Sequence, residues 1–196
     1  SMHTYPMHNS HYNPAFWGVF GDENKLSAIE QIDRAMVRAK NYIQNQYENT
    51  VSYVKSLDIQ KEIHIGETGW ASYSNGIYGL SGSNATDEYK AGLYYKHLRN
   101  WTHKDSITCF YFEAFDETWK DVNNPEGAEN HFGIFNIDGK AKFAIWDIYD
   151  QGVFKDLSRG LNPIEKTYLG KLDSLLQGVQ APEYKIMPKD PLNTKK

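Results

Sequence analysis

The feature that most constrains the fold is an apolar segment that stops abruptly at a charged residue. Residues 63–70 read IHIGETGW, so a run rich in β-branched side chains gives way to Glu67, a glycine and Trp70. Such runs favour strands, particularly where glycine follows them. We therefore expect a buried strand near residues 62–66, with Glu67 at its C-terminal end and an aromatic ring beside it.

Helical periodicity precedes and follows this strand. Ser27 and Glu30 have the spacing of a capping box, and apolar residues then recur every three or four positions toward Leu57. Capping and acidic residues at 84–88 predict a second helix, which runs through Trp101. Each helix leads into a strand, and this order is the βα rhythm of a parallel barrel or a doubly wound sheet.

A second strand is predicted at residues 107–112, which are apolar throughout and therefore typical of a parallel strand covered on both faces. Less regular segments surround these elements. We expect residues 1–26 to form an irregular loop, and we expect two further helices at 143–149 and 164–176. The proline-rich segment 181–196 is predicted to be an extended tail.

Composition disfavours several classes of function. The chain has 196 residues, enough for one domain with a sizeable core, and its net charge of −4 disfavours nucleic acid as a partner. The single cysteine, Cys109, excludes an internal disulfide, and no apolar run reaches the ~20 residues that a membrane-spanning helix needs. The spacing of His3, His8 and His11 matches no standard zinc pattern, so we predict no metal and no cofactor.

Charged and aromatic residues also follow the second strand. Residues 112–120 read FEAFDETWK, and residues 131–135 read HFGIF. Together with GETGW at 66–70, these motifs resemble glycoside hydrolase family 17, the β-1,3-glucanases and related glucanosyltransferases, and in particular its bacterial branch. The resemblance spans roughly residues 5–143. It implies a (β/α)8 barrel that cleaves a β-1,3-glucan such as laminarin with retention of configuration at the anomeric carbon.

The resemblance also implies roles for individual residues. Glu67 matches the family's catalytic nucleophile at the end of the seventh strand, and a retaining glycosidase needs such an ionised carboxylate to attack the sugar. Lys120 is the natural candidate to stabilise the charge of Glu67. Tyr5 matches a tyrosine at the end of the sixth strand. The substrate-binding residues that we predict are Tyr5, Trp70, Glu117, Trp119, Lys120 and Glu129.

Other conspicuous side chains have simpler interpretations. Glu113, Asp116 and Glu129 could each be an ordinary salt-bridge partner. For Trp101 and Trp146, we predict packing in the core rather than contact with a ligand, because filling a large core is the commoner use of aromatic residues.

The chain departs from the family pattern at the general acid/base. The family uses a glutamate after an asparagine at the end of the fourth strand, and no Asn-Glu pair precedes Glu67. We therefore predict an α/β fold in which residues 1–180 form the C-terminal part of a (β/α)8 barrel, about strands 7 and 8 with their helices. Because this part is incomplete on its own, we expect a complementary barrel fragment or a homo-oligomer to supply the missing strands.

Two functions from different classes stay open. The first is a retaining hydrolase or transglycosylase of β-1,3-glucan, secreted, periplasmic or at the cell surface because its substrate is a polymer. The second is a non-catalytic glucan-binding or assembly fragment that uses the same aromatic cleft. A β-1,4-galactanase is a weaker alternative, because those enzymes share the acid-glycine-aromatic strand end but lack the FDETWK run.

Overall fold

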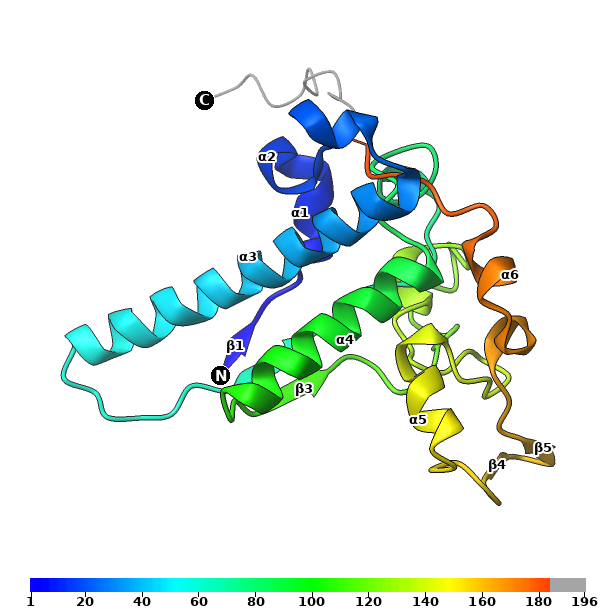
Figure 1. Ribbon diagram of the computed structural model, residues 1–196. Helices are drawn as coiled ribbons and strands as arrows, with labels where there is room; N and C mark the ends of the chain where they lie inside the picture. The colour runs from blue at the N-terminus through cyan, green and yellow to red at the C-terminus, as the bar shows by residue number, and fades with distance from the viewer. Residues whose placement is uncertain (184–196) are drawn as a thin grey trace.

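A computed structural model describes residues 1–183, and three short parallel strands form its central sheet (Figure 1). β1 (Met2–His3), β2 (Ile65–Thr68) and β3 (Cys109–Tyr111) are hydrogen-bonded in that order. β2 and β3 confirm the two predicted strands, although β2 begins later than expected, and β1 is an addition to them. Most of the predicted tail at 181–196 lies outside the described residues.

Two long helices connect the strands, pack against each other and run in the same direction (Figure 1). α3 (Ala28–Ser56) begins at the predicted capping box. The Glu30 N–H donates to Ser27 Oγ at 3.3 Å, and the Ser27 N–H donates to the Glu30 carboxylate at 2.9 Å. α4 (Glu88–Lys104) is capped by the side chain of Asp87. Because each helix links neighbouring parallel strands, the two units are βαβ crossovers.

The N-terminal region is largely helical, so the prediction of an irregular loop there is wrong. It contains α1 (Pro6–Tyr12), α2 (Pro14–Trp17) and the 3-10 helix η1 (Gly21–Lys25). A proline begins both α helices, because its fixed φ and missing N–H suit the first helical position. Trp17 is fully buried, and its Nε1–H donates to the Ser83 carbonyl at 2.6 Å, which ties this region to the loop before α4.

The C-terminal part is built from short elements. η4 (Phe143–Ile145) and α5 (Trp146–Asp150) confirm the helix predicted at 143–149. β4 (Ser158–Arg159) and β5 (Asn162–Pro163) then form an antiparallel hairpin. Two further 3-10 helices lie in the long loops after β2 and β3: η2 (Gly76–Tyr78) and η3 (Ala128–Asn130).

The helix predicted over 164–176 is wrong as a continuous element. The chain forms η5 (Thr167–Gly170) and then α6 (Leu172–Leu176) instead. Tyr168 and Leu169 have left-handed φ values of 51° and 54°, a conformation that no α-helix of L-residues can propagate. The apolar spacing alone did not reveal this break.

The hydrophobic core joins α3 and α4 to the sheet and extends to the N-terminal helices. Trp17 and Trp70 are among its largest fully buried side chains. Trp101 and Trp146 are 8% and 6% exposed, which confirms their predicted role in packing. The indole N–H of Trp146 is satisfied by the Ala141 carbonyl at 3.1 Å, as burial of a polar group requires.

One face of β3 is open. Phe110 is 63% exposed, so the prediction that this strand is covered on both faces is wrong for the described residues. Parallel strands are normally covered on both sides.

No helix within the described part of the chain has the length and apolarity needed to cross a membrane.

Candidate active site

Glu67 lies on β2 and contacts the segment at and after β1. The Tyr5 hydroxyl donates a hydrogen bond to Glu67 Oε1, and His3 Nδ1 lies 3.6 Å from Glu67 Oε2. The parallel register pairs His3 with Glu67, which explains why these side chains meet. The side chain of Glu67 is 38% exposed, so its carboxylate is accessible to a ligand.

Tyr5 is held as a hydrogen-bond donor. Burial raises its pKa well above the usual value of a phenol. The hydrogen bond and the charge of Glu67 raise the pKa further, followed by the charges of Glu129 and Glu113. The ring of Tyr5 also packs edge-on against Phe132, with centroids 5.6 Å apart. The phenol therefore stays protonated around neutral pH and keeps donating to Glu67.

A second charged cluster surrounds Lys120. Its ammonium lies 2.5 Å from Glu113 Oε2, 3.3 Å from Glu117 Oε2 and 3.7 Å from the centroid of the Phe112 ring. Burial lowers the pKa of Lys120, but hydrogen bonds and charges of the two glutamates outweigh it and leave the pKa raised. Among the described residues, Lys120 forms no ion pair with Glu67. The predicted direct stabilisation of Glu67 by Lys120 is therefore corrected.

Glu113 is a nearly buried carboxyl within this second cluster. Burial raises its pKa to about 7, although the hydrogen bond and charge of Lys120 oppose the shift. The neighbouring Glu117 raises the pKa again. The side chain is 10% exposed, and its Oε1 is buried with no hydrogen-bond partner in the described part of the chain. The ion pair with Lys120 confirms the interpretation of Glu113 as a salt-bridge partner.

A close backbone approach brings the two clusters to the same edge of the sheet. A Cβ atom on Gly69 would lie 2.2 Å from the Phe112 carbonyl oxygen and 3.0 Å from the Phe132 ring. Only glycine fits here, and it lets the segments after β2 and β3 lie against each other. Because the carboxyl ends of parallel strands meet at one edge, the clusters of Glu67 and Lys120 share that edge.

The remaining predicted site residues divide into buried and exposed ones. Trp70 is 1% exposed, its ring centroid lies 5.5 Å from that of Trp17, and its Nε1–H donates to the Ala85 carbonyl at 2.9 Å. The predicted substrate contact of Trp70 is therefore corrected to a core role, because a covered ring has no face for a sugar. Trp119 is 69% exposed and Glu129 is exposed, so both are accessible to a ligand.

Sequence reasoning missed a buried ion pair in the segment after β3, which is hydrogen-bonded to the loop after β2. Lys142 Nζ lies 2.6 Å from Asp116 Oδ1 and donates to Ser72 Oγ at 2.7 Å. Burial lowers the pKa of Lys142, and the charge of Asp116 opposes that shift. Asp116 is thus a salt-bridge partner, as interpreted from the sequence. Its partner lies 26 positions away, and no local pattern marks that distance.

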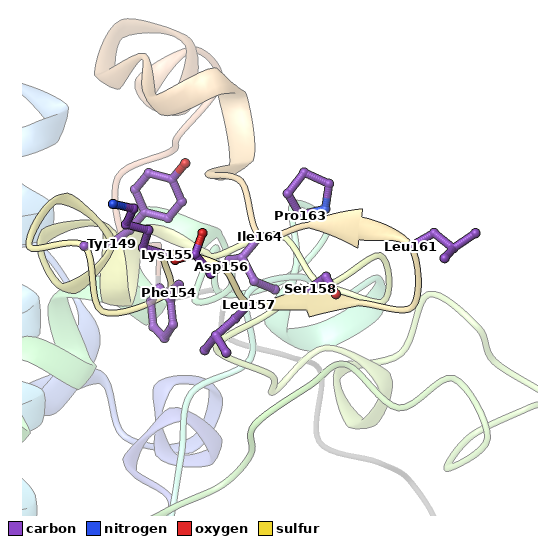
Figure 2. Close-up of a pocket in the computed structure, with 10 residues that line it drawn as sticks. Tyr149, Phe154, Lys155, Asp156, Leu157, Ser158, Leu161, Pro163 and Ile164 are labelled. Carbon is purple, nitrogen blue, oxygen red and sulfur yellow. The ribbon is translucent and has the colours of Figure 1, made fainter.

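A hollow of about 550 Å³ lies against the β4–β5 hairpin (Figure 2). Tyr149, Phe154 and Leu157 are among the residues that line it, and Figure 2 shows Leu161 at the hairpin turn, pointing outward. None of the predicted site residues belongs to its lining. The candidate active site therefore lies at the sheet edge and not in this hollow.

The parallel strands are joined by helical crossovers, which defines a β/α protein. Its candidate active site is a hydrogen-bonded carboxylate at the C-terminal edge of the sheet. The chain belongs to the glycosyl hydrolases family 17, whose family model matches residues 30–146. This match confirms the family resemblance seen in the sequence.

Individual relatives agree with this membership. The chain is similar to the crystal structure of an endo-laminarinase from Formosa Hel1_33_131, with a TM-score of 0.90 and 57% identity over 97% of this chain and 49% of that one. It is 27% identical over 146 residues to a glucan 1,3-beta-glucosidase of Saccharomyces cerevisiae, covering 66% of this chain and 45% of that protein. A glucan 1,3-beta-glucosidase of Arthroderma benhamiae is 36% identical over 88 residues, 41% of this chain and 27% of that protein. The chain thus spans half or less of these proteins.

Proposed function

We propose that this chain carries the nucleophile of a retaining β-1,3-glucan hydrolase or transglycosylase, and that Glu67 is that nucleophile. The observation that carries the proposal is the hydrogen bond from Tyr5 to Glu67 at the carboxyl edge of the sheet, in a member of family 17. The 57% identity to an endo-laminarinase supports laminarin-type β-1,3-glucan as the substrate.

The proposed chemistry uses the two oxygens of Glu67 differently. Tyr5 occupies one oxygen and fixes the plane of the carboxylate, while the other attacks the anomeric carbon of the glucan. The glycosidic C–O bond breaks as the ester to Glu67 forms, and the leaving oxygen takes a proton from the general acid. Water then cleaves the ester in hydrolysis, or a sugar hydroxyl does so in transglycosylation.

The Lys120 cluster supplies groups for the substrate. Lys120, Glu117 and Glu129 provide charged donors and acceptors for sugar hydroxyls, and such charge-assisted hydrogen bonds are the stronger kind. The exposed ring of Trp119 offers an apolar face for a pyranose. Tyr5 contacts the same sugar unit as Glu67 in this proposal.

We also propose that residues 1–180 are the C-terminal part of a (β/α)8 barrel. The parallel order of β1, β2 and β3, the open face at Phe110 and the 49% coverage of the laminarinase chain support this. A complementary fragment or a second copy would supply further strands, and the general acid/base would come from a complementary fragment, since no Asn-Glu pair precedes Glu67 in this chain. A polymeric substrate favours a secreted, periplasmic or cell-surface location.

Laminarin hydrolysis tests the catalytic proposal. We would assay the chain alone and after mixing with a fragment that carries the complementary strands of a family 17 barrel. We expect activity on mixing, its loss in Glu67→Gln, and its retention in Glu48→Gln, which changes an exposed glutamate of α3. Hydrolysis that survives Glu67→Gln would contradict the nucleophile assignment. Saturable laminarin binding without hydrolysis in either mixture would favour the non-catalytic glucan-binding function instead.

Size-exclusion chromatography tests the barrel proposal. We expect the 196-residue chain to elute as an oligomer, or to form a stoichiometric complex with the complementary fragment. A well-folded monomer that associates with neither would contradict the proposal.

A further inference from the structure

A polar pocket of about 380 Å³ is lined in part by the loops that follow β2 and β3 and is not used by the proposed mechanism. Tyr73 and Tyr168 line it together with the buried residues Lys142 and Asp116 and the half-buried Glu88. We call it the Tyr73–Tyr168 pocket. Its volume falls in the range of roughly 300–1,000 Å³ that small-molecule sites occupy.

The charged residues of the pocket keep unused hydrogen-bonding capacity. The Lys142 ammonium has three N–H donors, and its hydrogen bonds within the described part of the chain are to Asp116 and Ser72. Asp116 Oδ1 accepts from Lys142 and from the Gly133 N–H, whereas His131 Nδ1 lies 4.0 Å from Oδ2, beyond hydrogen-bond distance. A donor and an acceptor thus stand next to each other, which suits a hydroxyl group, since a hydroxyl both donates and accepts.

The two tyrosines supply apolar surface around these groups. Tyr73 and Tyr168 are each 47% exposed, so each ring presents a face or an edge to solvent. A flanking pair of aromatic rings around polar groups suits a sugar, whose ring faces are apolar and whose rim is polar.

Hydrogen bonds of the preceding residue hold Tyr168 in a strained backbone conformation. Tyr168 and Leu169 both have positive φ, and such strained residues persist only where the surrounding structure determines their conformation. The preceding Thr167 is fixed on both sides. Its N–H donates to the Ala141 carbonyl at 2.9 Å, and its hydroxyl donates to Glu88. Strain of this kind clusters at ligand sites, and here it sets the position of a ring that lines the pocket.

The balance of charges favours a neutral ligand. Two basic residues, Lys140 and Lys142, and two acidic residues, Glu88 and Asp116, line the pocket. An anion would meet two carboxylates and a cation would meet two ammonium groups, so neither is favoured electrostatically. A polyhydroxylated neutral molecule meets no such opposition.

The position of the pocket connects it to the candidate active site. Ser72 and Tyr73 belong to the loop that follows Glu67, and Asp116 lies between Glu113 and Glu117 in the loop after β3. We infer that the Tyr73–Tyr168 pocket is a second saccharide subsite, which binds a glucosyl unit of the same glucan chain at a distance from the unit that Glu67 attacks. This inference rests on the proposed function. Tyr168 lies outside residues 30–146, the segment that the family model matches.

Oligosaccharide length distinguishes this subsite from the catalytic one. We would measure by calorimetry the binding of laminari-oligosaccharides of two to six units to the Glu67→Gln chain mixed with the complementary barrel fragment, because this substitution prevents turnover. Adding Tyr168→Ala or Tyr73→Ala should weaken binding of the longer oligosaccharides about tenfold and leave the disaccharide unchanged. Tyr168→Phe, which keeps the ring, should bind nearly as well as the parent. Tyr53→Ala removes a tyrosine of α3 that is 65% exposed and should change nothing.

Four other outcomes would contradict parts of this inference. Unchanged affinity in both alanine variants would overturn the subsite while leaving the proposed function intact. An equal loss at every length would overturn its separation from the catalytic unit, and a loss in Tyr168→Phe equal to that in Tyr168→Ala would overturn the role of the ring. Tyr73 lies in a different loop from the strained turn at Tyr168. Tyr73→Ala therefore tests the subsite even if Tyr168→Ala disturbs folding at that turn. Failure of the Glu67→Gln parent to bind any laminari-oligosaccharide would overturn the proposed function together with the subsite.

Discussion

Replacing Glu113 by glutamine should change how the stability of the chain depends on pH. Burial raises the folded-state pKa of Glu113 from 4.5 to about 7. Below the lower value the carboxyl is protonated in both states. Between the two values the unfolded chain releases its proton first, so stability falls as pH rises. At ~1.4 kcal/mol per pKa unit, the loss amounts to about 3 kcal/mol. The side chain is 10% exposed, so solvent does little to weaken this effect.

Urea unfolding of the full chain at several pH values between about 4.5 and 8 measures this effect. The difference in free energy of unfolding between Glu113→Gln and the parent should shift by about 3 kcal/mol in favour of the variant across that range. The ion pair with Lys120 is already included in this value, because Lys120 lowers the folded-state pKa that burial raises to about 7. Glu48→Gln, at an exposed position, should show a flat difference. A flat difference for Glu113→Gln as well would refute the reasoning from burial.

Three further substitutions test the packing around the site, each by urea unfolding. Ser27→Ala removes the cap of α3 and should cost about 1 kcal/mol. Gly69→Ala drives a methyl group into the Phe112 carbonyl and should cost about 1–3 kcal/mol, and unchanged stability would show that the two loops do not approach as described. Lys142→Met leaves the buried carboxylate of Asp116 without its cation and should lower the free energy of unfolding by about 3–5 kcal/mol. The double variant with Asp116→Leu should recover most of this loss.

The regular elements could be predicted because their signals are local. The spacing of Ser27 and Glu30 predicted the start of α3, and the β-branched run before Glu67 predicted β2 within a few residues. Short elements were harder to predict. α1 spans only Pro6–Tyr12, and such a helix is stabilised by burial of Met7 and its neighbours rather than by intrinsic propensity.

The site was predicted less completely, because its contacts join distant segments. The motif around Glu67 pointed to the carboxylate. The sequence did not specify the backbone turn after it, which decides where the side chain of Trp70 lies. Lys120 pairs with glutamates of its own loop, since proximity along the chain favoured those partners over Glu67. Lys142 carried no signal at all, because its partners lie 26 and 70 positions away.

Covalent trapping tests the central claim most directly. A 2-deoxy-2-fluoro laminaribiosyl donor with a dinitrophenolate leaving group needs no proton from a general acid, so its reaction depends on the nucleophile alone. After incubation with the chain, peptide mapping by mass spectrometry should find one glycosyl adduct on Glu67 and none in Glu67→Gln. An adduct on another carboxylate such as Glu113 or Glu117, or release of the leaving group with no adduct on Glu67, would contradict the account.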